Sequence, residues 1–524
     1  MNKKYLLPLI LILCLALTLT GYSANLFSTY DQRIKLTIDN TKIDSDLTWF
    51  PVTVFLTSSQ GEEVFAEFDA DADFDRCAFT TSDEVTQIYG DCELFDDSES
   101  KAIYHIAKTG VAISNTATTD FYMYYDNDAA HNTSYIGTKN PDLIVSRDIG
   151  SSAIDRPEFS SYDTIIDKNN PSNFDGTITT VSIWASSNMT DCEVGTFYAV
   201  DATHYTSRDT QAVGAVTAGA KRDFTVSLDV EIGDYIGIYQ TGGRIEQTGS
   251  GDGFWYVASG GDIPCTNLEF TFRADRTVSL YGTGTPTAGE NVWDSNYKSV
   301  HHMNDATTST ILDSTSNYDG VKKAANEPVE ATGKVGQGQD FDGDEYIDTG
   351  ILINTDNDFT ISGITKVTDK TAQQAFWGGQ PANENGGRSY VGFRDSKYWA
   401  AIGETQAYDI ANTGVTNDTY FHWALVADSG TAYWYLNGAQ VDTFSYTGAG
   451  QQVTYANYIG AIHTYEGTGN YLTGVSDENR LALSARSAAW LKAEYNSLWD
   501  TLLTYGSEET GGVTYNAINF GMNF

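Results

Sequence analysis

Residues 335–348 read VGQGQDFDGDEYID, and this stretch decides the fold of the C-terminal half of the chain. Phe341 stands among acidic residues, so we expect its side chain to enter a core while Asp342-Gly343 makes a turn. Residues 476–498, SDENRLALSARSAAWLKAEYNSL, form a second signature. Between the two, Gly-rich turns alternate with short aromatic runs, one of which ends at Asn437-Gly438, a typical hairpin turn. This pattern predicts an all-β domain.

Five ordered motifs of this region resemble the laminin-G-like family of concanavalin A-type jelly rolls. They are NVWDSNYKSVHHMND (291–305), the two signatures above, FHWALVAD (421–428) and YWYLNGAQV (433–441). The resemblance implies a jelly roll over residues 291–505. Such a fold usually binds sugars or other proteins and is not usually catalytic.

The N-terminal region resembles a secreted prokaryotic domain of unknown function that habitually precedes laminin-G-like domains. The matching runs are YDQRIKLTIDN, FPVTVFL, DFDRCAFT and TTDFYMYYDNDAA, within residues 25–140. The chain departs from the family at Tyr125-Asp126-Asn127, where the family has Gly in place of Asp126. Alternating residues predict strands at 33–39, 50–56 and 121–125.

The sequence therefore predicts an all-β, multidomain protein of β-sandwiches with one short C-terminal helix. Ser487 is the expected cap of that helix. We expect five segments: a signal peptide (1–24), the first domain (25–140), an inserted β-sandwich (141–290), the jelly roll (291–505), and a linker with a terminal strand (506–524).

The N-terminus is typical of a secretory signal. Lys3 and Lys4 precede an apolar run at 6–19, and Ala24 ends a plausible cleavage site. The sequence thus predicts a secreted or cell-surface protein, with an uncleaved membrane anchor as the alternative. Export permits disulfides, and we favour Cys77–Cys92 and Cys192–Cys265 over four free thiols.

The formal net charge is −40, which disfavours nucleic acid as a partner because nucleic acid needs a basic face. A polyanionic surface attracts divalent cations. Related jelly rolls often bind calcium at a sandwich edge, and carboxylates suit that ion. The candidate calcium ligands are Asp340, Asp342, Asp344 and Asp348; the alternative is a turn beside a core residue.

Aromatic side chains are the expected ligand-binding groups, because sugars stack on them while polar side chains bond the hydroxyls. The candidates, which we expect in loops of the jelly roll, are Trp377, Arg388, Tyr390, Arg394, Tyr398 and Trp399. Each has core packing as its alternative.

Catalytic signatures are weak. Glu67, Asp69 and Asp71 would face one side of a strand, as paired carboxylates do in some glycosidases, but an acidic surface is the alternative. Asp69 to Asp75 could also form a loose calcium loop. The adjacent pair His301-His302 is expected to be structural. No local motif of a metalloprotease or serine hydrolase occurs in the sequence.

Three functional hypotheses follow. The first is a non-enzymatic binding or adhesion protein whose jelly roll recognises a carbohydrate or a protein. The second is a structural subunit of an extracellular filament, surface layer or virion appendage that self-assembles through the strand-forming residues 513–524. The third is a glycoside hydrolase.

Overall fold

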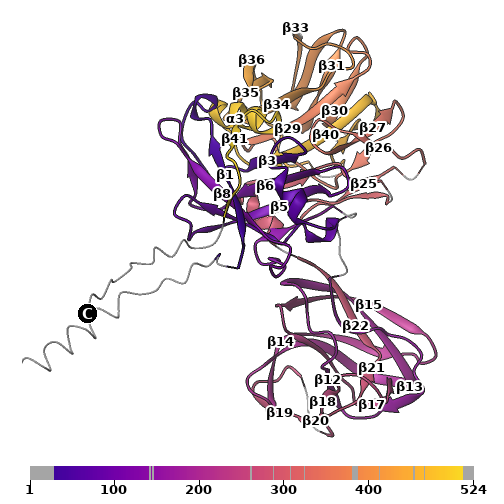
Figure 1. Ribbon diagram of the computed structural model, residues 1–524. Helices are drawn as coiled ribbons and strands as arrows, with labels where there is room; N and C mark the ends of the chain where they lie inside the picture. The colour runs from indigo at the N-terminus through magenta and orange to yellow at the C-terminus, as the bar shows by residue number, and fades with distance from the viewer. Residues whose placement is uncertain are drawn as a thin grey trace, which may run out of the picture.

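The computed structural model describes Phe27, Leu143 and residues 29–140, 147–259, 263–286, 288–306, 308–323, 325–380, 387–411, 414–452, 455–464 and 466–510. Within these residues the fold is all-β, as predicted, with five sheets and two α-helices (Figure 1). The predicted signal peptide and residues 513–524 lie outside the described residues.

The first domain is built on a nine-stranded sheet with the order β3-β6-β5-β4-β8-β1-β41. β1 alternates in burial because Ile34, Leu36 and Ile38 point into the core. Its elements are β1 (Gln32–Ile38), η1 (Asn40–Lys42), β2 (Leu47–Thr48), β3 (Val52–Thr57), α2 (Glu63–Glu67), η2 (Asp71–Asp73), β4 (Cys77–Thr81), β5 (Gln87–Asp96), β6 (Lys101–Ala107), β7 (Ala112–Ile113), β8 (Asp120–Tyr125) and β9 (Ile136–Gly137). The three strands predicted here are confirmed as β1, β3 and β8.

The C-terminal end of the described chain completes this sheet. β41 (Leu503–Tyr505) and β42 (Glu509–Thr510) both pair antiparallel with β1, with Leu36 opposite Tyr505. The predicted linker after residue 505 therefore contains a short strand that pairs within the chain itself.

The inserted domain is a separate sandwich around the 24-residue strand β13 (Gly176–Ala199). The first part of β13 pairs with β15 and β22, and its last part pairs with β14 and β16. Register shifts around Ser187 and Thr190 let one strand serve both layers, because bulges bend a strand. The other strands are β10 (Asp148–Ser151), β11 (Glu158–Ser160), β12 (Thr164–Asp167), β14 (His204–Val216), β15 (Lys221–Val230), β16 (Tyr235–Tyr239), β17 (Gly242–Thr248), β18 (Phe254–Val257), β19 (Leu268–Glu269), β20 (Thr271–Arg273), β21 (Thr277–Val278) and β22 (Leu280–Pro286).

The jelly roll consists of two stacked sheets with a core of large aromatic residues between them. Phe341 is 1% exposed in that core, and Gly343 has a φ of 108°, so both residues build the sandwich as predicted. After the linking turn η4 (Ala288–Val292), the eight-stranded sheet contains β23 (Tyr297–His301), β26 (Val329–Thr332), β27 (Gln337–Asp342), β29 (Phe359–Val367), β34 (Phe421–Asp428), β35 (Thr431–Leu436), β36 (Ala439–Ser445) and β40 (Thr473–Ala482). The ten-stranded sheet contains β24 (Thr310–Ile311), β25 (Gly320–Lys322), β28 (Ile347–Asp348), β30 (Gln374–Gly379), β31 (Arg388–Arg394), β32 (Lys397–Gly403), β33 (Thr405–Ala411), β37 (Tyr458–Ile459), β38 (Ile462–Thr464) and β39 (Gly467–Gly469).

The first domain and the jelly roll share one hydrophobic core. That core joins residues of β1, β3 and β5 to Val300, Ala424, Val426 and Ala482 of the eight-stranded sheet. Consequently β29, β34 and β40 are buried on both faces and show no alternation. Figure 1 shows this joint body, which we call the host, above the inserted domain.

The predicted C-terminal helix is α3 (Ala488–Leu498), and the Ser487 side chain accepts a hydrogen bond from the Trp490 N–H at its start. Trp490 packs edge-on against Phe50 of the first domain at 5.0 Å between ring centroids. Ser497 Oγ accepts from the Thr53 N–H at 2.7 Å. The helix therefore fastens the jelly roll to the first domain.

The predicted disulfides are wrong, because all four described cysteines are free thiols. Cys77 and Cys92 lie in one core, but each thiol instead donates to a backbone carbonyl, that of Phe74 or Leu94. Cys192 belongs to the main core of the inserted domain, whereas Cys265 packs against a second cluster.

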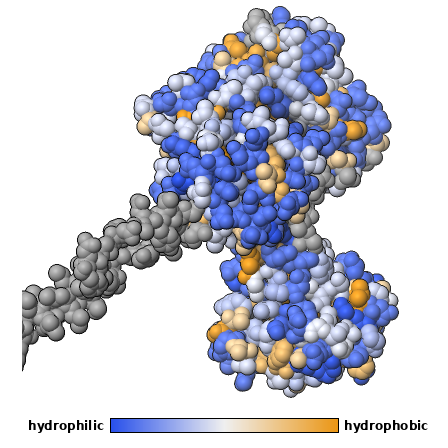
Figure 2. Space-filling view, in the orientation of Figure 1, coloured by the Kyte–Doolittle hydropathy of each residue, from blue (hydrophilic) through white to orange (hydrophobic). Residues whose placement is uncertain are grey.

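The visible surface is largely hydrophilic, with scattered apolar residues (Figure 2). This agrees with the large excess of acidic over basic residues. Among the described residues, no helix has the length and apolar character needed to cross a membrane.

Candidate functional site

The residues expected to bind a ligand are mostly core residues. Trp377 and Tyr398 belong to the core between the two sheets, and Tyr390 and Trp399 form a small cluster with Ala375 on the other face of the ten-stranded sheet. These four side chains are at most 4% exposed, so they cannot stack against a ligand in solution. Of the candidate set, Arg388 is also buried and Arg394 is exposed. The expectation of exposed loop aromatics was therefore wrong, because these residues lie on strands that are covered on both faces.

An open groove of about 800 Å³ instead lies at one edge of the jelly roll. Tyr318, Leu352 and Leu483 give it apolar walls, and the two leucines are 39% and 50% exposed. Lys298 Nζ lies 4.3 Å from the centroid of the Tyr318 ring. The half-buried Tyr318 ring beside exposed leucines is a surface on which an apolar face of a ligand can rest.

Polar side chains line the same groove. They are Asn354, Asn357, Asp358 and Gln451. The Ser429 N–H donates to Asp358 Oδ1 at 2.7 Å, which fixes the carboxylate and uses only one of its oxygens. Gln451 Nε2 donates to the Leu352 carbonyl at 3.2 Å. The groove thus combines apolar walls with oriented hydrogen-bonding groups.

The expected calcium ligands do not converge as a set of four. Asp342 and Asp344 come together with Glu345, but Asp348 Oδ1 accepts from the Gly350 N–H elsewhere. Glu345 Oε2 accepts from the Asp342 N–H at 2.7 Å. Asp344 accepts from Asn326 and lies 3.9 Å from Lys323 Nζ. Protein donors thus already occupy the acidic turn, and calcium binding there stays a prediction.

The acidic run of the first domain is not a strand. Glu67 ends α2, and Asp71 begins the turn η2, so the expected alternation on one face was wrong. Asp73 pairs with Arg76 at 2.8 Å, and buried Asp75 pairs with Arg147 and His131. These carboxylates hold loops together.

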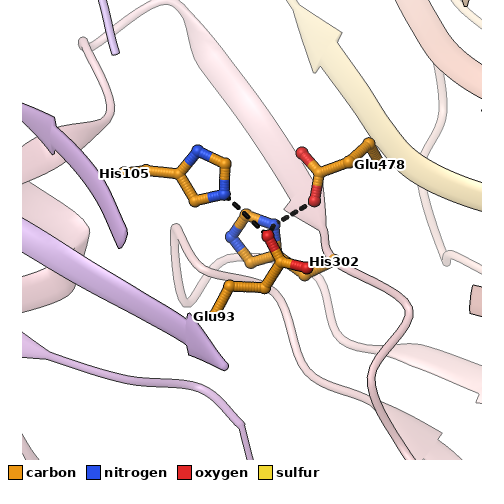
Figure 3. Close-up of side chains that lie close together, drawn as sticks. All are labelled: Glu93, His105, His302 and Glu478. Carbon is orange, nitrogen blue, oxygen red and sulfur yellow. Dashed lines mark hydrogen bonds and ion pairs between the residues drawn. The ribbon is translucent and has the colours of Figure 1, made fainter. Parts of the chain in front are cut away.

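A buried cluster that no sequence pattern predicted lies between the first domain and the jelly roll. It contains Glu93 of β5, His105 of β6, His302 just after β23, and Glu478 of β40 (Figure 3). One ligand-type atom of each residue lies within 4.8 Å of the others. The imidazole rings of His105 and His302 stack with centroids 4.6 Å apart.

Specific contacts orient each member of the cluster. His105 Nε2 lies 2.9 Å from Glu93 Oε2, and His302 Nδ1 contacts Glu478 Oε1. Arg480 Nε donates to Glu478 Oε2 at 3.1 Å. Asp91 Oδ2 accepts from Trp293 Nε1 at 2.9 Å.

The electrostatics of the cluster follow from burial and close charges. Burial and the charge of Glu478 raise the pKa of Glu93 well above its ordinary value. Burial alone would lower the pKa of His302, but Glu478 and Asp91 raise it well above its usual range. Burial, reinforced by the charge of His302, lowers the pKa of His105. The cluster therefore holds two inequivalent histidines among carboxylates.

His302 was predicted to be structural, and no sequence pattern pointed to Glu93 and His105. The HisHis motif at 301–302 and the acidic pair at 477–478 were visible signals. Nothing in the sequence showed that β5 and β6 face these motifs, since the two regions are far apart in the chain.

Comparisons with known proteins identify the C-terminal fold. Residues 341–511 match the family model of the concanavalin A-like lectin/glucanases superfamily. Comparison with curated proteins finds no match. The predicted resemblance of the first domain to a domain of unknown function is not confirmed by the family model and stays a prediction.

Several solved structures are similar. Domain 4 of AbnA, a GH43 extracellular arabinanase from Geobacillus stearothermophilus, in complex with arabinotriose, is 17% identical with a TM-score of 0.30, covering 40% of this chain and 98% of that chain. The binding domain of Paraclostridial Mosquitocidal Protein 1 is 12% identical with a TM-score of 0.29, covering 38% and 52%. The binding domain of botulinum neurotoxin DC in complex with rat synaptotagmin II is 12% identical with a TM-score of 0.29, covering 39% and 52%. This chain thus spans about half the length of the toxin domains. The family match and the two stacked sheets together make the C-terminal part of this chain a concanavalin A-like jelly roll.

Proposed function

We propose that this protein is an exported, non-enzymatic binding protein whose jelly roll recognises a neutral carbohydrate chain in the groove around Tyr318. The groove is the observation that supports this proposal, because it places an aromatic ring beside exposed leucines and oriented amide and carboxylate groups. Sugars present apolar CH faces and many hydroxyls, which suit such a lining. Neutral ligands are favoured because the chain has a net charge of −40.

The groove is also built on a rigid framework. Lys298 is a residue of β23, which pairs with β40. The stretch from Gly350 to Asp358 directly precedes β29 in the chain. Because the first domain covers the eight-stranded sheet, the strands that carry these residues are held on both sides. A preformed site of this kind loses little conformational entropy on binding.

The test is a glycan array with the full chain, followed by titration of a binding oligosaccharide. Tyr318→Ala should weaken binding about tenfold, the effect of losing one stacking ring, whereas Tyr318→Phe should preserve it. Tyr198→Ala is the matched control, because the Tyr198 ring of the inserted domain also lies beside a cation, with Arg208 Cζ 5.2 Å from its centroid, but outside the groove. Equal affinity of Tyr318→Ala and the unmodified chain would contradict the proposal.

Three other outcomes would replace this proposal. Binding of a protein but no glycan, lost in Tyr318→Ala, would assign the groove to a protein partner. Concentration-dependent polymers that disappear on deletion of residues 513–524 would favour the structural subunit. Release of reducing sugar that is abolished by Glu67→Gln would favour the hydrolase.

A further inference from the structure

We propose that Glu93, His105, His302 and Glu478 bind one divalent transition-metal ion, with zinc as the preferred ion, which ties the first domain to the jelly roll. The first domain supplies Glu93 and His105, and the jelly roll supplies the other two ligands. This site is separate from the groove and does not depend on the proposed carbohydrate binding.

The distances suit one ion. One ligand-type atom of each of the four residues lies within 4.8 Å of the others, and the candidate donors are Glu93 Oε2, His105 Nε2, His302 Nδ1 and Glu478 Oε1. His302 Nδ1 lies 3.7 Å from Glu93 Oε2, and His105 Nε2 lies 2.9 Å from the same oxygen. Tetrahedral zinc with bonds of about 2.0–2.1 Å spaces its ligands by about 3.3 Å, so small side-chain rotations complete the site.

The second ring nitrogen of each histidine has a partner of the kind that metal-bound histidines use. His302 Nε2 faces Asp91 Oδ2 at 3.4 Å, and that oxygen is itself held by Trp293. His105 Nδ1 faces Thr53 Oγ1 at 3.2 Å. Such contacts fix the tautomer and leave the other nitrogen free to ligate. An ordinary buried ion pair does not need this arrangement on both histidines.

The carboxylates show a matching arrangement and an unbalanced charge. Arg480 holds Glu478 Oε2, which leaves Oε1 facing the cluster. Glu93 Oε1 is buried and has no hydrogen-bond partner among the described residues. Asp91, Glu93, Asp477 and Glu478 bring four buried acidic groups, and among the described side chains Arg480 pairs with Glu478 while His302 faces Asp91, Glu93 and Glu478. A divalent ion adds positive charge where carboxylates are in excess.

The donor set selects the class of metal. Two imidazole nitrogens and two carboxylate oxygens suit zinc or a similar first-row ion, whereas calcium and magnesium prefer oxygen ligands alone. All four ligands are at most 3% exposed as side chains, so a bound ion would be closed off from solvent as structural zinc sites are.

The first experiment measures the metal content of the full chain. The chain is refolded with zinc, loosely bound zinc is removed with a chelator at low temperature, and the remaining metal is measured by mass spectrometry. We expect about one zinc per chain, and chelator present during refolding should lower the melting temperature of the host by about 10 °C. Refolding with cobalt(II) should give the visible absorption of a tetrahedral complex.

Two variants locate the ion. His302→Gln and Glu478→Gln should each lose the metal and the cobalt absorption. The control is His422→Gln, because His422 of β34 is equally buried and its Nε2 lies 3.0 Å from Glu494 Oε1 of α3, outside the cluster. The control should retain the full metal content.

Refolded unmodified chain that contains no zinc, shows no cobalt absorption and melts at the same temperature with and without chelator would overturn the proposal. The cobalt spectrum of the unmodified chain remains decisive even where a variant fails to fold. Metal retained in both His302→Gln and Glu478→Gln would also overturn it, because the ion would then lie elsewhere.

Discussion

The two parts of the host are joined tightly to each other, whereas the inserted domain is joined only loosely to the host. The two parts of the host are separated by the whole insertion, yet they share one core, and β41 completes the sheet of the first domain. The inserted domain has its own hydrophobic cores, and among the described residues the buried ion pair Arg147–Asp75 connects its base to the first domain. The inserted domain, which is adjacent in sequence to both parts of the host, is thus only loosely joined to them. The two parts of the host, which are distant in sequence, fold together.

The geometry of the insertion explains this contrast. β10 and β22, the first and last strands of the inserted domain, pair antiparallel, with Asp148 opposite Thr283. The chain therefore leaves the host and returns at nearly the same place. Gly137 and Gly289, which flank the insertion, lie against each other, since a Cβ on Gly137 would meet the Gly289 nitrogen at 2.3 Å. A domain inserted between adjacent points leaves its host undisturbed.

Dissecting the chain should give the largest effect. A chain without residues 25–140 should be insoluble or unfolded, because Ala424, Val426 and Ala482 would lose their cover. Replacing residues 147–286 with a short Gly/Ser linker should leave a folded host. Circular dichroism and thermal melting of the two products measure this difference. A jelly roll that melts cooperatively without the first domain would break the comparison.

Removing a large core side chain should lower the unfolding free energy of only the region that contains it. Trp490 and Trp255 are each 6% exposed, one in the host and the other in the inserted domain. Each Trp→Ala change should cost about 3–5 kcal/mol of unfolding free energy, and only in its own region. Denaturation followed by region-specific hydrogen exchange checks this. Destabilisation of the inserted domain by Trp490→Ala would show that the two regions are coupled.

The stability of the inserted domain should depend on the protonation of Asp167. Burial raises the pKa of Asp167 to about 6, against the hydrogen bonds from Ser151 and Asn169 that lower it. The folded domain therefore keeps this proton to a higher pH than the unfolded chain does. As pH rises from about 4 to about 6, the unfolded chain loses its proton first, so the folded state loses about 2–3 kcal/mol.

Asp167→Asn removes this titration. The unmodified domain loses stability as the pH rises, but the variant does not. The unfolding free energy of Asp167→Asn minus that of the unmodified domain should therefore be larger at about pH 7 than at about pH 4. Chemical denaturation at both pH values makes the comparison. A difference that does not change with pH would show that Asp167 is ionised at both.

The smallest effect is expected at the exposed pair Lys492–Asp44, which joins α3 to the first domain at 2.6 Å. Its side chains are 37% and 60% exposed, so Lys492→Met should change the stability of the host by less than about 0.5 kcal/mol. Urea denaturation at low and high salt measures this. A loss of several kcal/mol of unfolding free energy would show that surface charges, and not the shared core, hold the two parts of the host together.

Local patterns predicted the elements of the fold well. The strands β1, β3 and β8, the Ser487 cap and the roles of Phe341 and Gly343 follow from alternation, capping and turn chemistry, which act over a few residues. The length of β13 was not predictable, since its bulges depend on which strands it pairs with.

The functional groups were harder to predict for a physical reason. Alternation cannot tell an exposed Trp399 from one on a strand covered on both sides, so aromatic residues of the core were taken for ligand contacts. Tyr318 and Leu483 meet in a groove only after folding. Likewise, Glu93 and His302 approach each other because two distant regions share a core, and no local pattern encodes that contact.

Scanning calorimetry of the full chain, with the isolated inserted domain (147–286) run beside it, tests the division into host and insertion most directly. We expect two transitions, one of which coincides with that of the isolated domain and the other of which contains the first domain and the jelly roll together. A third transition, in which the jelly roll melts apart from the first domain, would contradict the shared core on which this account rests.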